Sequence, residues 1–218
     1  MPLVDVELSV QKSAFPDEIS EFLCEANSRI SQYFQEKTVC PTGFVPSDFE
    51  TVYHALRAII EASLAPGNSF CEWGSGFGVV ASLAAMLEFD ACGIEIDRGL
   101  IDASRTLAED FALPVEFVHG SFIPPGDDAL ADEVCAENHE NPFFLVTGAD
   151  SAYDSLERDP VDSDLVFAYP WPGEESVIEV LFEKNAAEGA LLLTYNQQHS
   201  VRLQRRLVAR SQRGEDAT

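Results

Sequence analysis

One short segment of this 218-residue sequence combines an acidic residue with three glycines at alternate positions. It reads FCEWGSGFG from Phe70 to Gly78, and Glu72 stands two residues before the first glycine. Glycines permit positive φ and leave no side chain between the backbone and a ligand. The helix that we expect next would offer unpaired N–H groups at its start. The segment therefore predicts a nucleotide-type ligand site between a strand and a helix.

The glycine spacing does not fit the dinucleotide-binding fingerprint. That fingerprint, G-x-G-x-x-G/A, requires a small third residue, and counting from Gly74 and Gly76 puts Val79 at that position. Glu72 would also repel a pyrophosphate, whereas it would attract the sulfonium and amino groups of S-adenosylmethionine (SAM). The pattern therefore favours SAM over a dinucleotide.

With this pattern the sequence resembles the class I SAM-dependent methyltransferases. The likeness extends from about Phe70 to Phe122 and, more loosely, through 164–195, which is roughly half of the chain. It implies transfer of a methyl group to a small molecule or a protein side chain. The resemblance also implies that four residues surround the methionine end of the cofactor: Glu72, Gly74, Gly76 and Gly78.

Residues after the second and third expected strands resemble the rest of a SAM site. The resemblance implies that Glu95, 21 residues after Gly74, accepts hydrogen bonds from both ribose hydroxyls through its two oxygens; Asp97 is the alternative. Family members commonly carry an Asp that contacts the adenine amino group where this chain has Ser121, whose hydroxyl can still accept that bond. Phe122 could pack on the adenine face or belong to the core.

The turn after the fourth expected strand reads AYPWP from Ala168 to Pro172. In amino-directed methyltransferases a polar residue, two prolines and an aromatic residue commonly position the acceptor nitrogen at this turn. Pro170 and Trp171 match that pattern, but Ala168 stands at the polar position and Tyr169 replaces a proline. We therefore expect Tyr169 and Trp171 to position the acceptor. The structural alternative is an aromatic-proline corner that holds the edge of the sheet.

The sequence offers no catalytic dyad, and methyl transfer does not require one. The leaving group of a sulfonium is already activated, so the protein mainly positions the reactants and excludes water. The four histidines form no cluster with an acid or a cysteine at a useful spacing. They predict neither a metal site nor a histidine-assisted nucleophile.

Two other functions stay open at this point. Ala168 and Ser121 would suit a SAM-binding interaction protein without turnover. Pro170-Trp171-Pro172 is similar to the Asp-Pro-Trp-Pro turn of transfer-RNA guanine methyltransferases, with five arginines between 202 and 213 as a docking patch. The interpretation that we prefer is that the arginines form a solvated helix face that offsets the acidic body.

The elements that must position these residues follow from hydrophobic periodicity. Amphipathic helices are expected at 17–37 and, from a Ser47-x-x-Glu50 capping box, at about 47–65. Strands then alternate with helices, which is typical of a parallel, doubly wound sheet. The expected strands cover 68–73, 91–96, 115–119, 164–169 and 189–195, and the expected helices cover 79–88, 99–111 and 174–187.

The fold class is therefore α/β, with a mostly parallel Rossmann-like sheet. We expect an N-terminal helical lid or cap at 1–65 and a SAM-binding domain at 66–218, with an acidic insertion at about 123–163. The insertion should contain one strand or hairpin, because an apolar run lies at 142–146. Only 23 residues follow Tyr195, so the last edge strand comes from 201–208 or the sheet is shortened. A shortened sheet would leave an edge to cover, which makes a homodimer an expectation.

Composition limits the partners. With 13 Lys and Arg against 38 Asp and Glu, the net charge is −25, which disfavours nucleic acids and anionic membranes. No apolar stretch reaches the length of a membrane span, and the N-terminus lacks the pattern of a signal peptide. Five scattered cysteines do not form a disulfide framework. A cytoplasmic protein is the simplest interpretation.

Overall fold

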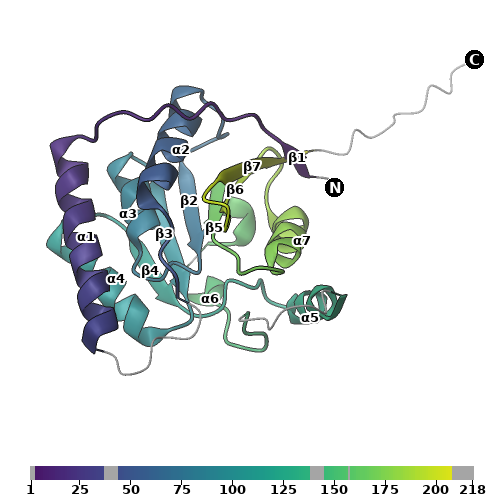
Figure 1. Cartoon of the computed structure of the whole chain (residues 1–218). Helices are drawn as coiled ribbons and strands as arrows, with labels where there is room; N and C mark the ends of the chain where they lie inside the picture. The colour runs from purple at the N-terminus through teal and green to yellow at the C-terminus, as the bar shows by residue number, and fades with distance from the viewer. Residues whose placement is uncertain (1–2, 37–43, 138–144, 157, 208–218) are drawn as a thin grey trace, which may run out of the picture.

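The computed structural model describes residues 3–36, 44–137, 145–156 and 158–207. Within these residues a single seven-stranded sheet lies between two layers of helices (Figure 1). The strands are β1 (Leu3–Asp5), β2 (Ser69–Trp73), β3 (Asp90–Glu95), β4 (Glu116–His119), β5 (Leu165–Ala168), β6 (Leu191–Tyr195) and β7 (Val201–Arg206). The helices are α1 (Asp17–Glu36), α2 (Phe49–Glu61), α3 (Val79–Met86), α4 (Arg98–Asp110), α5 (Asp128–Glu137), α6 (Tyr153–Leu156) and α7 (Glu175–Asn185).

The strand order β1-β7-β6-β5-β2-β3-β4 makes the sheet doubly wound. Strands β2 to β6 are parallel, and β7 is antiparallel to both of its neighbours. Because successive strand residues point to opposite faces, each strand serves two cores. Phe70 and Phe167 pack with α2, α3 and α4 on one face. Cys71 and Val166 pack with α7 on the other. The α/β, mostly parallel Rossmann-like fold expected from the sequence is confirmed.

The expected elements occur with boundaries shifted by a few residues. The start of α2 differs in its chemistry, because Asp48 and not Ser47 is the N-cap. The Asp48 carboxylate accepts a hydrogen bond of 3.1 Å from the backbone N–H of Thr51. The expected capping box of Ser47 and Glu50 was therefore wrong, and the N-cap lies one residue later. Helix α1 packs outside α3 and α4, where Phe22 and Leu107 share a third apolar cluster.

The C-terminal edge of the sheet is not shortened, and its last strand comes from the N-terminus. Residues 201–206 form the antiparallel strand β7, so a helical face for the arginines was wrong there. The short strand β1 then pairs with β7, with Leu3 opposite Arg206. This N-terminal strand was missed in the sequence, and it covers the edge on which the expectation of a dimer rested.

The described arginines of β7 hold neighbouring parts of the molecule. Arg202 forms ion pairs with Asp5 of β1, at 2.7 Å, and with Glu179 of α7, at 2.5 Å. The guanidinium of Arg205 donates to the carbonyl of Leu64 (2.9 Å). Arg206 donates likewise to the carbonyl of Glu183, at 2.7 Å. Arg210 and Arg213 lie outside the described residues.

The acidic insertion contains helices where we expected a strand or hairpin. Its described residues include α5, α6 and a short 3₁₀ helix (Pro160–Asp162). Ser151 of the insertion forms an isolated parallel β-bridge with Ser121, which follows β4. The apolar run at 142–146 is described only from Leu145, whose side chain packs against the core.

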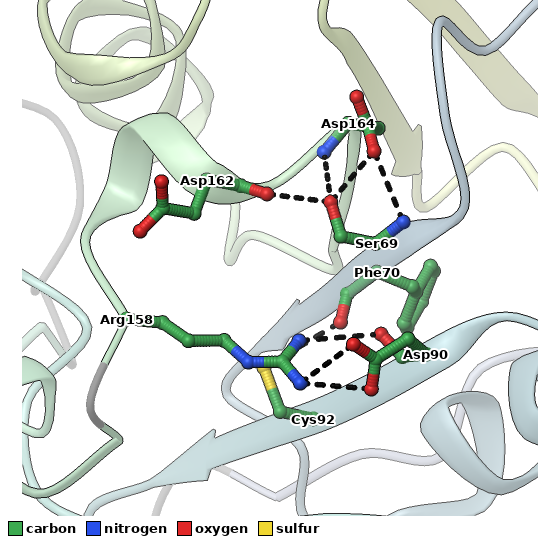
Figure 2. Close-up of polar contacts among 7 residues, drawn as sticks. All are labelled: Ser69, Phe70, Asp90, Cys92, Arg158, Asp162 and Asp164. Atoms are coloured by element: carbon green, nitrogen blue, oxygen red, sulfur yellow. Dashed lines mark hydrogen bonds and ion pairs between the residues drawn. The ribbon is translucent and has the colours of Figure 1, made fainter.

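The end of the insertion is fastened to the amino ends of the central strands (Figure 2). Ser69 is the first residue of β2, and Asp164 directly precedes β5. The carboxylate of Asp164 accepts hydrogen bonds from the backbone N–H and the hydroxyl of Ser69, at 3.1 and 2.7 Å. Arg158 donates to both carboxylate oxygens of Asp90 at the start of β3, at 2.8 and 2.7 Å. These contacts occupy the amino ends of the strands, so a ligand site is to be sought at the opposite, carboxyl ends.

In the described part of the chain, no helix has the length and apolar character needed to cross a membrane.

Candidate functional site

A cavity of about 190 Å³ opens at the carboxyl ends of β2, β3, β4 and β5. The strand order reverses between β2 and β5, because the chain continues from β2 to β3 on one side and later returns to β5 on the other. Ligands of open α/β sheets bind at such a switch point. Most of the residues predicted from the sequence line this cavity: Glu72, Gly74, Glu95, Ser121, Phe122, Tyr169 and Trp171.

The glycine bend after β2 forms one wall of the cavity. The N–H groups of Gly74 and Ser75 both donate to the carbonyl of Ile94, at 2.9 and 2.8 Å, which ties the bend to the end of β3. Gly74 has a φ of 74° and open space where a Cβ would be. The hydroxyl of Ser75 is buried and has no hydrogen-bond partner in the structure. The bend therefore presents bare backbone to the cavity at Gly74 and holds a buried hydroxyl without a partner beside it.

The other two glycines of the motif stand behind this wall. Gly78, with a φ of 67°, is the N-cap of α3, and an added Cβ would come within 2.3 Å of the Phe117 ring. At Gly76, with a φ of 53°, a Cβ would meet the ring of Phe44 at 2.4 Å. Both glycines therefore allow close packing and a left-handed backbone, and neither lines the cavity itself.

Glu95 stands at the tip of β3 with a buried carboxylate in the cavity wall. Its two oxygens accept hydrogen bonds from the N–H groups of Gly76 (2.8 Å) and Asp97 (2.9 Å). Burial raises the pKa of the Glu95 carboxyl, and these two donors work in the opposite direction. Asp97, the alternative, is half-buried and caps α4 by accepting from the N–H of Leu100 at 3.0 Å. Asp97 therefore has a helix-capping role, whereas Glu95 ties the glycine bend to the end of β3.

Glu72 is buried at the end of β2 and also faces the cavity. Its carboxylate accepts a hydrogen bond of 2.8 Å from the N–H of Ala81, in the first turn of α3. It thereby supplies the side-chain cap that Gly78 cannot give. Burial raises the pKa of the Glu72 carboxyl well above its ordinary value, and the nearby charge of Glu95 adds to the effect. Two buried acids therefore face one cavity that a cation would neutralise.

The buried charge of Glu72 leads to a prediction for the ligand-free protein. Because the folded pKa lies above the unfolded value of about 4.5, the unfolded state holds fewer protons, and stability falls as the pH rises from there toward the folded pKa. Glu72→Gln removes this penalty and keeps an acceptor for Ala81. We expect its free energy of unfolding to exceed that of the native sequence at pH 8.

Urea unfolding at several pH values measures this difference. The gain should shrink as the pH falls toward about 4.5, and Glu109→Gln, on the exposed surface of α4, should show no such trend. A Glu72→Gln variant that is less stable than the native protein at pH 8 would contradict the prediction.

Ser121 and Phe122 form the wall after β4. The Ser121 hydroxyl is buried and accepts from the N–H of Ile123 at 3.1 Å, which leaves a further lone pair. The ring of Phe122 stacks on Trp73, with ring centres 5.3 Å apart and planes within 7°. Trp73 belongs to the core on the face of the sheet that α7 covers, and it also lines the cavity. Phe122 therefore packs against the core and also lines the cavity, and its contact with adenine stays a prediction.

The turn after β5 forms the remaining wall, together with the start of α7. Tyr169 is half-buried and rests edge-to-face against Tyr195, with ring centres 4.9 Å apart. Trp171 is also half-buried. The backbone N–H of Trp171 donates to the carboxylate of Glu174 at 3.4 Å, and the same carboxylate accepts from the backbone N–H of Leu145 at 2.9 Å. Ala168 is buried at the position where a polar residue was expected.

Several cavity residues were not predicted from the sequence. Ser75 lies inside the glycine motif, and its small polar side chain was a usable signal. Ile96 is 40 % exposed, although the buried Glu95 precedes it; an apolar residue next to the acid expected to bind the ribose was a usable signal. Phe44 and Val45 also line the cavity, and they come from the segment before α2, inside the N-terminal region that we expected to form a lid or cap.

The sequence comparisons are limited in extent. No protein-family model matches the chain. The ribosomal protein L11 methyltransferase of Cupriavidus taiwanensis is 35% identical over 96 residues, which are 43% of this chain and 31% of that protein. The chain thus spans about a third of the length of the curated relative that it matches.

Solved structures extend the likeness to most of the chain. An RNA methyltransferase from Salinibacter ruber, in complex with S-adenosyl-L-homocysteine, matches 79% of this chain and 100% of its own, with a TM-score of 0.52 and 15% identity. A methyltransferase from Geobacter sulfurreducens matches 89% and 92%, with a TM-score of 0.53 and 13% identity. This chain has the class I methyltransferase fold.

Within the class I methyltransferase fold, this chain has an unusual sheet edge. Members commonly close the sheet with an antiparallel C-terminal hairpin, whereas here β7 supplies one strand and the N-terminal β1 supplies its partner. The N-terminal residues are thus part of the fold's own sheet.

Proposed function

We propose that this protein is a SAM-dependent methyltransferase whose cofactor binds in the cavity at the carboxyl ends of β2, β3 and β4. The observation that carries the proposal is the buried Glu95 carboxylate at the tip of β3, beside the open backbone at Gly74. An adenosyl ligand has donors for that carboxylate in its ribose hydroxyls, and a dinucleotide would bring a pyrophosphate toward Glu72.

The residues present fit this cofactor. The free space at Gly74 suits the close approach of the polar methionine end of SAM to the backbone. Glu72 offers negative charge to its cationic groups. Ser121 retains a lone pair for the adenine amino group, and Ile96 and Phe122 offer apolar surface to the ring.

When bound, SAM would supply a methyl group on a sulfonium, from which a neutral thioether is a good leaving group. The chain then has to orient the acceptor in line with that methyl group and to exclude water. Tyr169 and Trp171 stand at the cavity end where an acceptor would enter. Their rings would position it, because Ala168 offers no polar side chain.

We further propose that the segment from Phe44 to Phe49, within the N-terminal region expected as a lid, covers the cofactor. Phe44 lies against Gly76 and stacks on Phe34 of α1, with ring centres 5.7 Å apart. Val45, Pro46, Ser47 and Phe49 also line the cavity. This segment therefore forms the side of the cavity opposite the sheet's strand ends, which suits a lid over a bound nucleoside.

The arginines of β7 do not support an RNA substrate. Arg202, Arg205 and Arg206 are engaged by Asp5, Glu179 and backbone carbonyls, and no Lys, Arg or His is among the described residues that line the cavity. We therefore propose an acceptor that carries no phosphate at the site of transfer, in a small molecule or a protein side chain.

Calorimetry with SAM and with its demethylated product tests the cofactor, and transfer of a labelled methyl group to fractionated cell extract tests turnover. We expect micromolar binding and a labelled product. Absence of heat at millimolar ligand would refute the proposal. Tight binding without any transfer would instead support an interaction protein, and labelled RNA with salt-sensitive binding would support an RNA methyltransferase.

A further inference from the structure

The cavity has a second end, on the β5 and β6 side of the strand-order reversal. Its walls are the turn after β5, the start of α7 and two residues of the acidic insertion: Tyr169, Trp171, Glu174, Leu145 and Val146. The glycine bend and Glu95 belong to β2 and β3, on the other side of the reversal. The far end is therefore available to an acceptor while the near end holds a nucleoside.

Glu174 brings a carboxylate to this far end. It is 6% exposed and lines the cavity. The hydrogen bonds that it accepts from the N–H groups of Leu145 and Trp171, at 2.9 and 3.4 Å, hold it between the two walls. The carboxylate is thus fixed in position by backbone that also forms the site, so its charge has a defined location.

The charged side chains among the described residues that line the cavity are all acidic. Its described lining residues include four carboxylates and no Lys, Arg or His, the acids being Glu72, Glu95, Asp97 and Glu174. A phosphate or carboxylate acceptor would be repelled there, and a cation would be attracted. SAM would neutralise the near end, but Glu174 is on the side of the acceptor.

The other walls of the far end suit a cation on an apolar stem. Faces of tryptophan and tyrosine rings attract ammonium groups, and Trp171 and Tyr169 stand there, the latter held by Tyr195. Val146 is 48% exposed and Leu145 is half-buried, so an aliphatic chain has apolar surface to cover. Aromatic rings, a fixed carboxylate and apolar side chains together form a site for an alkylammonium.

We propose that the methyl acceptor is an aliphatic primary amine that binds beside Glu174, an inference that rests on the proposed function. The bound ammonium releases a proton to water, and the nitrogen lone pair then forms the N–C bond as the C–S bond breaks. The electron pair of that bond stays on sulfur, and the positive charge moves to the methylated nitrogen. Glu174 and the two rings stabilise that charge as it develops.

Binding to the protein saturated with S-adenosyl-L-homocysteine provides a readout that does not require turnover. We expect n-hexylamine to bind at least about 10-fold more tightly than n-hexanol, and n-hexanoate not to bind, because a buried charged hydrogen bond contributes about 1.5–3 kcal/mol. Glu174→Gln should weaken amine binding by about 10-fold to 100-fold. It should leave the affinity for S-adenosyl-L-homocysteine unchanged. Glu188→Gln, which removes an exposed charge elsewhere, should change neither.

Methyl transfer then separates the two sources of such an amine. Cadaverine tests a free amine, and a lysine peptide against the same peptide with norleucine tests a protein side chain. Equal binding of hexylamine and hexanol, or equal amine affinity of the native protein and Glu174→Gln, would overturn the inference, as would transfer only to oxygen or RNA. The ligand series on the native protein decides the matter even if Glu174→Gln does not fold. Failure to bind the cofactor at all would instead refute the proposed function.

Discussion

Replacing Glu95 by alanine should weaken SAM binding by about 100-fold or more, since two hydrogen bonds to a buried carboxylate are lost at about 1.5–3 kcal/mol each. The carboxylate is buried at the tip of β3, and its oxygens already accept from Gly76 and Asp97. A ribose would add its hydroxyl donors to the remaining lone pairs. Isothermal calorimetry with SAM measures the loss.

Asp97→Ala is the matched control, because it removes the other acid of the same loop. It takes away the N-cap of α4, so it should lower the free energy of unfolding by about 1 kcal/mol and change SAM affinity by only a few-fold. Glu95→Ala should retain its fold by circular dichroism. A larger loss of affinity in Asp97→Ala than in Glu95→Ala would transfer the ribose-binding role to Asp97.

Alanine at Gly78 should destabilise the fold, whereas alanine at Gly74 should mainly reduce ligand binding. Both glycines have positive φ, 67° and 74°, which costs a non-glycine residue about 1–3 kcal/mol. At Gly78 the new Cβ also meets the Phe117 ring at 2.3 Å and the Cβ of Ser104 at 2.8 Å, while at Gly74 it meets nothing within 4 Å. Strain and overpacking together should cost Gly78→Ala about 3 kcal/mol or more.

Thermal unfolding and SAM calorimetry on both variants check this contrast. Gly78→Ala should unfold at a much lower temperature than Gly74→Ala, and the added change Phe117→Leu should restore part of the lost stability by making room for the methyl group. Gly74→Ala should remain folded and bind SAM more weakly, because its methyl group projects where the cofactor would lie. Equal stability of the two single variants would contradict the packing assigned to Gly78.

Local patterns in the sequence were sufficient for the central sheet and its helices. Strand β2, the glycine bend and helix α3 follow one another without interruption, so the bend could be located from residue types alone. The spans of β3, β4, β5 and β6 were predicted within a few residues because apolar residues that face two cores form short continuous runs. The alternation of these strands with helices predicted the α/β, mostly parallel sheet.

Contacts between distant residues required the folded chain. Strand β1 has three residues and no periodicity, and it becomes a strand because β7 offers it an edge. Arg202 pairs with Asp5, which lies 197 positions away in the sequence. A residue of the expected cationic patch therefore connects β7 to β1. Such pairs depend on the path of the whole chain, which no local pattern encodes.

The candidate site divides in the same way. The glycine motif and its resemblance to the methyltransferases pointed to Glu72, Gly74 and Glu95, and the three line one cavity because the strand ends of a parallel sheet bring successive loops to one edge. Only the tertiary structure decided that Asp97 caps a helix, that Phe44 covers Gly76 and that the Glu174 carboxylate is fixed at the far end of the cavity. A side chain's burial and its hydrogen-bond donors come from elements that meet only after folding, and these determine what its charge can do.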